Sequence, residues 1–264
     1  MSGRDEYYNR AKQEGYRTRA AYKLKQLDDE ADLFAPGDTV VDLGAAPGGW
    51  MQVAAERVGE GGTVIGVDRQ RIDPFEETHG ARVETIRGDM TEDETKDRIR
   101  ETVGDTDDAG GPVDVVISDM APNVSGEYEL DHARSIHLAR QAFETAVDVL
   151  ESGGDFVVKV FDGPDLADFR AEVEEEFEYV RATSPDASRD ASSELYLIGK
   201  GFLTAPVRAG DRLTVEIEDE GREGDGIAKV EGYTLFVSGT EEGESVEVEV
   251  TDVKPRYGFA ERVD

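Results

Sequence analysis

The segment Thr39–Trp50, TVVDLGAAPGGW, constrains the fold more than any other part of the chain. An apolar run that contains one carboxylate is followed by a turn rich in glycine and alanine. In such a turn, backbone N–H groups can approach a ligand closely. A second apolar run, 63–67, ends in Asp68. In doubly wound α/β folds the first βα turn binds part of a nucleoside cofactor. An acidic residue about twenty residues after that turn accepts hydrogen bonds from both ribose hydroxyls. The spacing therefore predicts a nucleoside cofactor with Asp68 on its ribose.

The residue sequence of the turn limits which cofactor it can bind. It reads GAAPGG rather than the GxGxxG of pyrophosphate binders, and no Walker lysine follows it. A cofactor without a diphosphate is favoured, and S-adenosylmethionine is the first candidate. NAD and a purely structural turn are the alternatives.

Composition bounds the class of protein. A chain of 264 residues can hold an α/β domain of about 200 residues and a small second domain. The absence of cysteine excludes disulfides, thiolate zinc sites and cysteine nucleophiles. No apolar run approaches a membrane span, and no signal segment opens the chain. We expect a soluble, cytoplasmic protein without a membrane partner.

The formal net charge is −32, from 61 acidic and 29 basic residues spread along the chain. A disordered chain is one interpretation, but regular apolar periodicity between the acidic patches argues against it. At 1 M ionic strength charge repulsion is screened over roughly 3 Å, so this surface suits a high-salt cytoplasm. We therefore expect a halophilic source, and the net charge says little about partners.

Short apolar runs and helical patterns alternate up to Gly201 and predict an open, doubly wound, mostly parallel sheet. The predicted strands are 40–43, 63–67, 83–86, 113–118, 156–161 and 195–198. One predicted helix carries Ile136, Ala139, Phe143, Val147 and Leu150 and is closed by Gly153 and Gly154. Another carries Leu166, Phe169, Val173 and Phe177.

Beyond Gly201 the helical period disappears. Alternating apolar positions separated by glycine-rich acidic turns predict a small antiparallel β-barrel: Leu213, Val215, Ile217; Leu235, Val237; Val246, Val248, Val250. We therefore expect two domains, 1–203 and 204–264. The barrel is expected either to supply RNA affinity through Lys229, Lys254, Arg256, Tyr257 and Phe259 or merely to stabilise the larger domain.

The N-terminal arm, Arg4 to Arg19, is the one locally basic segment, and tyrosines interleave its cations. This mixture suits a nucleic-acid strand, and a solvated arm is the alternative. A helix is expected from Thr18. At about 100° per residue, Lys23 falls at the edge of its apolar stripe and Lys25 points to the far side, so Lys23 can reach a site at the sheet edge.

Four carboxylates mark the predicted ends of the central strands: Asp42, Asp68, Asp89 and Asp119. Ligands of such sheets bind at the carboxyl ends of the strands. Lys159 lies inside the apolar strand VVKVF, where burial would lower the pKa of its ammonium and suit it to act as a general base. The segment SDMAPN lacks the aromatic of amine methylases, and no cysteine is present for pyrimidine C5 methylation, so a hydroxyl acceptor fits best.

Six motifs in order resemble the FtsJ/RlmE family of ribosomal RNA 2′-O-methyltransferases over about residues 5–202: DLGAAPGGW, GVD, GDM, SDMAPNVSG, GGDFVVKVF and SSELYLIGKGF. The resemblance implies a Rossmann-like class I methyltransferase fold and a catalytic set of Lys23, Asp119, Lys159 and Glu194. It also implies cofactor contacts by Gly48, Trp50, Asp68, Asp89 and Asp119. The tail, with GDGIAKVEGYTLFVSG, resembles a TRAM domain.

These observations predict S-adenosylmethionine-dependent 2′-O-methylation of a uridine in 23S ribosomal RNA, free or in the large subunit. No metal is expected, because the leaving group is a neutral thioether. We expect no DNA partner and favour a monomer. The alternatives are methylation of a transfer RNA anticodon loop, a ribosome-assembly RNA-binding protein with incidental methylation, and a small-molecule O-methyltransferase.

Overall fold

The structure is a computed structural model that describes residues 3–104, 110–123, 125–188, 193–221 and 224–263. Val124 of SDMAPNVSG, Ser192 of SSELYLIGKGF and residues 222–223 of a predicted turn lie outside the described residues. The side chain of Arg4 in the basic arm is also outside them.

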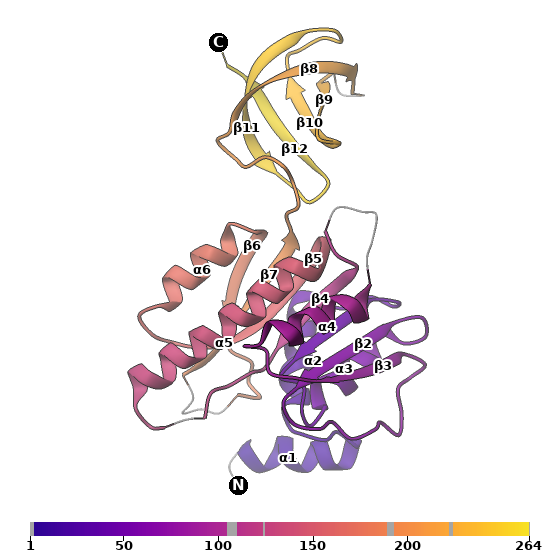
Figure 1. The fold of residues 1–264 in the computed structure, drawn as a ribbon, viewed down its shortest axis with the longest axis vertical. Helices are drawn as coiled ribbons and strands as arrows, with labels where there is room; N and C mark the ends of the chain where they lie inside the picture. Colours follow the sequence, from indigo (N-terminus) through magenta and orange to yellow (C-terminus); the bar gives the residue numbers. More distant parts are fainter. Residues whose placement is uncertain (1–2, 105–109, 124, 189–192, 222–223, 264) are drawn as a thin grey trace.

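A seven-stranded sheet with helices is followed by a five-stranded closed barrel (Figure 1). The first part contains α1 Gly3–Glu14, α2 Ala21–Ala31, β1 Thr39–Leu43, α3 Gly49–Val58, β2 Thr63–Asp68, β3 Arg82–Arg87, α4 Asp93–Val103, β4 Val113–Ser118, α5 Tyr128–Val149, β5 Leu150–Phe161, α6 Leu166–Glu174, β6 Phe177–Thr183 and β7 Glu194–Phe202. The barrel contains β8 Arg212–Glu220, β9 Gly226–Val230, β10 Tyr233–Ser238, β11 Ser245–Val253 and β12 Tyr257–Arg262.

The strand order of the sheet is β3-β2-β1-β4-β5-β7-β6. Strands β1 to β5 run parallel, and β7 is antiparallel to both β5 and β6. The chain builds outward from β1 through β2 and β3 and then returns to β4, so the order reverses between β1 and β4. The doubly wound, mostly parallel sheet is confirmed, and its switch point is where such folds bind ligands.

Two apolar clusters cover the two faces of the sheet, because alternate strand residues point to opposite sides. On one face, Leu24 and Leu27 of α2 and Met51 of α3 pack with sheet residues such as Val40. On the other face, α4, α5 and α6 pack on the sheet, with Phe169 among the buried side chains. Lys23 and Tyr22 are also buried on α2, which places Lys23 at the covered side of that helix.

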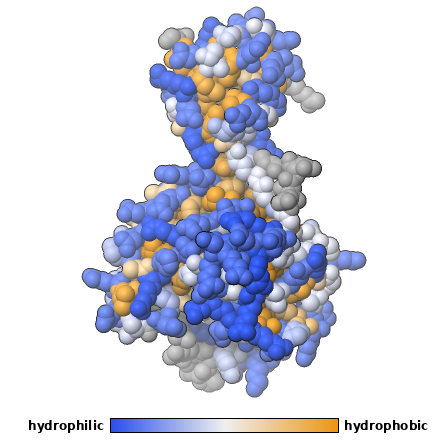
Figure 2. Space-filling view, viewed as in Figure 1, coloured by the Kyte–Doolittle hydropathy of each residue, from blue (hydrophilic) through white to orange (hydrophobic). Residues whose placement is uncertain are grey.

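The barrel has its own core, which includes Leu235, Val237, Val248 and Ala260. It stands at the end of the sheet where β5 begins, and α1 lies near the opposite end (Figure 1). Figure 2 shows a largely hydrophilic surface, with hydrophobic colour running over the barrel toward the junction. No helix of the described residues is long and apolar enough to cross a membrane.

The structure corrects the predicted barrel pairing. β10 and β12 are parallel, whereas the four other strand pairs are antiparallel. The strands β9 and β12 were not predicted, because each has few alternating apolar residues. β12 lies between β11, its neighbour in sequence, and β10, and alternation alone does not specify strand direction.

Two predicted helix ends are wrong. Leu150 has extended dihedrals and begins β5, which also includes Gly153 and Gly154. A Cβ on Gly154 would lie 2.9 Å from the Asp114 carbonyl oxygen, so this glycine permits close backbone approach rather than closing a helix. α6 ends at Glu174, and Phe177 instead begins the unpredicted strand β6.

The basic N-terminal arm is mostly the helix α1, and several of its side chains are engaged within the protein. Tyr7 and Tyr16 pack on Tyr22 of α2, with ring centroids 5.5 and 5.8 Å away. Arg17 donates hydrogen bonds to the carbonyl oxygens of Pro47 and Pro74 at 2.8 and 2.6 Å. This arginine therefore ties the arm to the glycine-rich loop.

Candidate active site

The loop between β1 and α3 is shaped by glycine. The backbone N–H groups of Gly44 and Ala45 both donate to the Val67 carbonyl oxygen, at 2.8 and 3.1 Å, and so hold the loop against β2. Gly44 has a φ of +82°, and a Cβ there would lie 2.4 Å from Cγ of Met120. Only glycine meets both the dihedral and the close approach.

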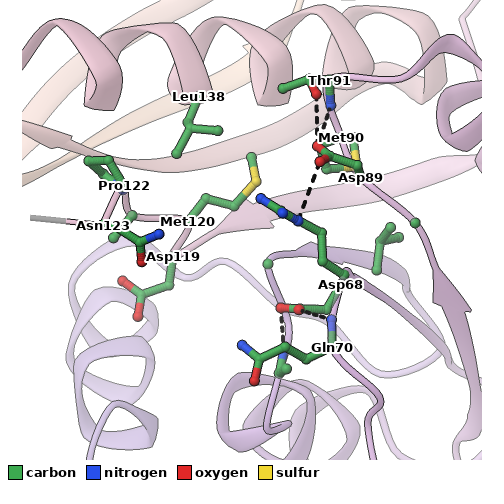
Figure 3. A pocket seen from close by; sticks show the side chains of 16 residues that line it. Asp68, Gln70, Asp89, Met90, Thr91, Asp119, Met120, Pro122, Asn123 and Leu138 are labelled. Carbon is green, nitrogen blue, oxygen red and sulfur yellow. Dashed lines mark hydrogen bonds and ion pairs between the residues drawn. The ribbon is translucent and has the colours of Figure 1, made fainter.

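Asp68, at the end of β2, links the loop to the segment that follows it. Its Oδ2 accepts a hydrogen bond from the Ala46 N–H at 3.0 Å, and its Oδ1 accepts one from the Gln70 N–H at 2.7 Å (Figure 3). A carboxylate oxygen can accept more than one hydrogen bond. Asp68 therefore orders the loop and keeps acceptor capacity for a ligand hydroxyl.

Asp89 follows β3 and is fixed by Thr91 and Arg69. Its Oδ1 accepts hydrogen bonds from the N–H and hydroxyl of Thr91 at 3.1 and 2.8 Å, and its Oδ2 lies 3.3 Å from Nε of Arg69 (Figure 3). The backbone hydrogen bond from Thr91 is the largest of the effects that lower the pKa of Asp89. The side chain is therefore a fixed anion at the rim.

A pocket of about 730 Å³ opens at the carboxyl ends of these strands. This volume is within the range of small-molecule sites, about 300 to 1,000 Å³. The residues that line it are Gly44, Ala46, Val67, Asp68, Arg69, Gln70, Gly88, Asp89, Met90, Thr91, Asp119, Met120, Ala121, Pro122, Asn123 and Leu138. Three of the predicted carboxylates, Asp68, Asp89 and Asp119, thus face one cavity.

Gly48 and Trp50, both predicted to contact the cofactor, do not line this pocket. Trp50 is buried, its Nε1 donates to the Ala20 carbonyl oxygen at 2.8 Å, and its ring lies 5.8 Å from that of Tyr196. Gly48 has a φ of +107°, and a Cβ there would lie 2.8 Å from the Arg17 guanidinium. In this structure Trp50 contacts Ala20 and Tyr196, and Gly48 lies close to Arg17.

Asp42 lies near the end of its strand as predicted, one residue before the last of β1, but it does not line the pocket. It lies inside β1, is fully buried, and both its carboxylate oxygens lack a hydrogen-bond partner among the described residues. Burial, with smaller effects from the charges of Asp119 and Asp68, raises the pKa of Asp42 well above its ordinary value. A neutral carboxyl is the form that this site favours.

Beside the pocket, Lys159 of β5 pairs with Asp119. The Lys159 ammonium donates to Oδ1 of Asp119 at 2.9 Å and also to its carbonyl oxygen. Only 5% of the Lys159 side chain is exposed. The lysine inside the apolar strand is therefore buried with a carboxylate partner, as buried charges require.

Lys23 of α2 completes the cluster from the other side. Its ammonium forms an ion pair with Oε1 of Glu194, lies 3.1 Å from the Tyr196 hydroxyl and 4.0 Å from Oδ1 of Asp119. Lys25 instead lies 3.5 Å from Glu56. The helical spacing thus placed the two lysines correctly, and the four residues Lys23, Asp119, Lys159 and Glu194 lie together.

Tyr196 is a member of this cluster that the sequence reading missed. Its hydroxyl donates to Oδ1 of Asp119 at 2.7 Å, and the side chain is fully buried. Burial and the charges of Asp119 and Glu194 raise the pKa of Tyr196 well above its ordinary value, so the hydroxyl stays protonated. The signal was its position two residues after Glu194, which puts both on one face of β7.

Asp119 belongs to both the pocket and the cluster. Burial raises the pKa of Asp119, but the charges of Lys159 and Lys23, with hydrogen bonds from Tyr196 and Lys159, outweigh burial and hold it below its ordinary value. The carboxylate is therefore negative at neutral pH. Among the described residues no group of three or more His, Asp or Glu side chains is arranged to hold a metal ion.

Two domain models match the chain. An FtsJ-like methyltransferase model covers residues 16–202, and a TRAM domain model covers residues 206–263. A solved structure from Plasmodium falciparum, described as a ribosomal RNA methyltransferase, superimposes with a TM-score of 0.60 and 26% identity. It covers 71% of this chain and 98% of that one.

Full-length relatives share the name "Ribosomal RNA large subunit methyltransferase E". Those from Haloarcula marismortui and Natronomonas pharaonis are 69% and 66% identical over 264 residues, which is all of each chain. One from Methanosarcina mazei is 50% identical over 258 residues, 98% of this chain and 92% of its own. The first two are haloarchaeal, in agreement with the source expected from the acidic surface.

Proposed function

Because the chain belongs to the FtsJ-like methyltransferase family, we propose that it methylates the 2′-hydroxyl of a uridine in 23S ribosomal RNA, using S-adenosylmethionine. The names of its relatives support large-subunit ribosomal RNA as the substrate. The 2′-oxygen and the uridine rest on the resemblance of the motifs.

The observation that carries this proposal is the shared position of Asp119. This carboxylate lines the pocket and also binds Lys159 at 2.9 Å. A base held at the mouth of a cofactor pocket is what transfer of a methyl group to a hydroxyl needs.

The pocket suits S-adenosylmethionine better than a dinucleotide. Its lining has three carboxylates, Asp68, Asp89 and Asp119, against one cation, Arg69, and this excess of negative charge would attract a cationic cofactor and repel a diphosphate. Asp68 is the residue that would accept both ribose hydroxyls, and Asp89 would contact the base end. When bound, the cofactor supplies an electrophilic methyl group and leaves as a neutral thioether, so the reaction needs no metal.

Each member of the cluster has a role in this account. The Lys159 ammonium first releases a proton to solvent, and the neutral amine then accepts the proton of the 2′-hydroxyl, a contribution of roughly 10² to 10⁴ in rate. Asp119 orients Lys159, while Lys23 stabilises the developing alkoxide or positions the ribose. Glu194 fixes Lys23 through their ion pair.

The partners follow from the same proposal. We propose a cytoplasmic protein that acts on 23S ribosomal RNA or the large ribosomal subunit, does not act on DNA, and is a monomer. α1 and the barrel are its candidate RNA-contacting parts. Arg17 is already bound to two carbonyl oxygens, so we exclude it from the expected phosphate contacts.

Transfer RNA is the nearest rival substrate, because the catalytic cluster serves any ribose hydroxyl. An assembly factor with incidental methylation is disfavoured by the complete cluster, and a small-molecule enzyme by the attached barrel. Purified protein with labelled S-adenosylmethionine should methylate large subunits or 23S RNA but not transfer RNA, and digestion should yield 2′-O-methyluridine. Label in transfer RNA alone, or on a base, would contradict the proposal.

A further inference from the structure

In a chain with 61 acidic and 29 basic residues, a lysine or arginine without a partner is informative. Nearly all described lysine and arginine side chains form an ion pair with a carboxylate or donate to a carbonyl or hydroxyl oxygen. The described ones that do neither are Lys12, Arg19, Arg134 and Arg256. Arg189, Arg222 and the side chain of Arg4 lie outside the described residues.

Arg134 lies one helical turn from the cofactor pocket. It is exposed on α5, four residues before Leu138, which lines the pocket from the side of that helix (Figure 3). Residues four apart are neighbours on one face of a helix, and helical side chains tilt toward the N-terminus. Arg134 therefore extends from the pocket wall toward the beginning of α5.

The beginning of α5 is fastened to the carboxyl end of β5, the strand that carries the proposed base. The Tyr128 hydroxyl donates to the Asp162 carbonyl oxygen at 2.6 Å, and Nδ1 of His132 lies 2.9 Å from the Phe161 carbonyl oxygen. Arg134 follows two residues after this second contact. It therefore lies at the edge of the sheet where the methyl acceptor must enter.

The carboxylates of the same part of α5 leave this arginine unpaired. Asp131 lies on its side of the helix, but the Asp131 oxygens accept hydrogen bonds from the N–H and hydroxyl of Ser125 and the N–H of Gly126, at 2.8 to 3.1 Å. Glu127 is two turns away, about 10 Å along the axis, and Glu129 points to the far side at about 100° per residue. The guanidinium can therefore bind an anion from outside the chain.

Arg19 has the matching position on the other face of the sheet. It precedes α2 and lies four residues before Lys23, whose ammonium is 4.0 Å from Oδ1 of Asp119. The N–H groups of Tyr22 and Lys23 donate to the carbonyl oxygens of Arg19 and Ala20 at 3.2 and 3.0 Å, so the chain already turns as a helix there. α2 and α5 pack on opposite faces of the sheet. The catalytic cluster and the pocket therefore lie between two unpaired arginines.

The other two unpaired cations lie elsewhere. Lys12 is on α1, in the basic arm already expected to contact RNA. Arg256 is exposed on the barrel beside two exposed rings of β12, and its neighbour Pro255 accepts a hydrogen bond from the Ser152 hydroxyl near the start of β5. Lys159 follows Ser152 by seven residues, which is about 20 Å along a strand. Arg256 is therefore placed for a more distant part of the RNA.

Building on the proposed function, we propose that Arg134 binds a phosphate group of the substrate RNA beside the methylated nucleotide, and that Arg19 binds a phosphate on its other side. A ribose within an RNA strand carries a phosphate on each side, so a strand whose 2′-hydroxyl faces Lys159 passes both arginines. A guanidinium donates paired hydrogen bonds to phosphate oxygens. The strand then crosses the edge of the sheet from α2 to α5.

Binding of 23S RNA from a strain that lacks the gene tests this proposal with the full chain. Affinity is measured at several potassium chloride concentrations for wild type, Arg134→Gln and Arg19→Gln. A phosphate contact releases counterions, so each variant should lower the slope of log affinity against log salt by about 0.7. At the lowest salt concentration at which the protein stays folded, affinity should fall about tenfold.

Two further variants separate charge from packing. Arg134→Lys keeps the charge and should recover most of the lost affinity. Arg82→Gln removes a cation at the start of β3, the opposite end of the sheet from the pocket, and should change neither slope nor affinity. In methyl transfer, Arg134→Gln should raise KM for 23S RNA and leave kcat unchanged. Its affinity for S-adenosylmethionine should also stay unchanged, because Arg134 does not line the pocket.

An unchanged salt slope together with an unchanged KM in Arg134→Gln would overturn the proposal. Weaker S-adenosylmethionine binding with normal RNA binding would overturn it as well, since the arginine would then contact the cofactor. The salt slope is measured without methyl transfer. If wild type shows the expected slopes but transfers no methyl group, the proposed function fails and the phosphate contact stands.

Discussion

At the scale of single residues, Lys159 shows what sequence could predict and what it could not. A lysine between four apolar residues predicts a functional position, because a buried ammonium needs a partner. Which partner it has depends on where β4 and β5 meet, and the structure places Asp119 there. Tyr196 escaped prediction because its hydroxyl is hidden in a strand that otherwise appears apolar.

Lys159→Ala should abolish methyl transfer and leave cofactor affinity nearly intact, because the lysine acts only when the hydroxyl loses its proton. Lys25→Ala, on the far side of α2, should have little effect. Single-turnover rates and cofactor titration of both variants check this. Equal activity of the two variants would refute both the assigned base and the helical-face argument.

Asp68→Ala should weaken S-adenosylmethionine binding by roughly a hundredfold to ten-thousandfold, since two charged hydrogen bonds to the ribose are lost and each is worth about 1.5 to 3 kcal/mol. Part of the loss would come from the Ala46 N–H that Asp68 now holds. Asp73→Ala is the control, because that carboxylate is 83% exposed. Calorimetry that finds unchanged affinity in folded Asp68→Ala would remove this aspartate from the site.

Asp42 predicts a specific pH dependence. The pKa of Asp42 is raised above its ordinary 3.8, so the unfolded chain releases this proton first, and folding loses stability as pH rises from about 4 toward the folded pKa. Asp42→Asn carries no such proton. Its melting temperature relative to wild type should therefore rise as the pH increases above about 4.

Thermal unfolding at molar salt measures this difference, with Asp73→Asn as the exposed control. A difference that stays constant with pH would show that Asp42 is ionised in the folded protein at all these values. It would also mean that a group outside the described interactions compensates its charge.

At the scale of elements, the periodicity of apolar residues predicted the positions of most strands but not of all helix ends. Lys23 was assigned correctly because α2 is a regular helix with a clear apolar stripe. Phe177 continued the helical spacing of α6 by coincidence, and its ring packs against Phe156 and Phe202 from β6. Tertiary packing therefore determines where α6 ends, and the local sequence contains no signal for that position.

β7 offers a test at this scale, because it supplies both Glu194 and Tyr196 to the cluster. Tyr196→Phe keeps the ring and removes the hydrogen bond to Asp119. We expect kcat to fall about tenfold with KM unchanged, as for loss of one hydrogen bond to a charged group. A raised KM with normal kcat would instead assign the hydroxyl to substrate binding.

At the scale of the whole molecule, the two-part architecture followed from a change of period beyond Gly201. The boundary between 203 and 204 stays a prediction; the sheet strands end at Phe202 and the barrel strands begin at Arg212. Among the described residues, side-chain contacts that join the parts include Ser152 to the Pro255 carbonyl oxygen at 2.7 Å, Lys254 to Glu178, and Arg208 to Glu176 at 3.2 Å. How the barrel sits on the sheet could not be predicted, because these contacts are far apart in sequence.

Removal of residues 205–264 should therefore leave the sheet domain folded and able to bind cofactor, because the barrel core is a separate cluster. KM for the large-subunit substrate should rise at molar salt. Thermal unfolding and steady-state kinetics of the truncated protein check both parts. Unchanged KM with a large loss of stability would give the barrel a purely structural role.

The most direct test of the account is a map of 2′-O-methyl groups in ribosomal and transfer RNA from three strains: wild type, a gene deletion, and the deletion complemented with Lys159→Ala. We expect one uridine of 23S RNA to lose its 2′-O-methyl group in the deletion, and we expect Lys159→Ala not to restore it. An unchanged map of 23S RNA, or a loss confined to transfer RNA, would contradict it.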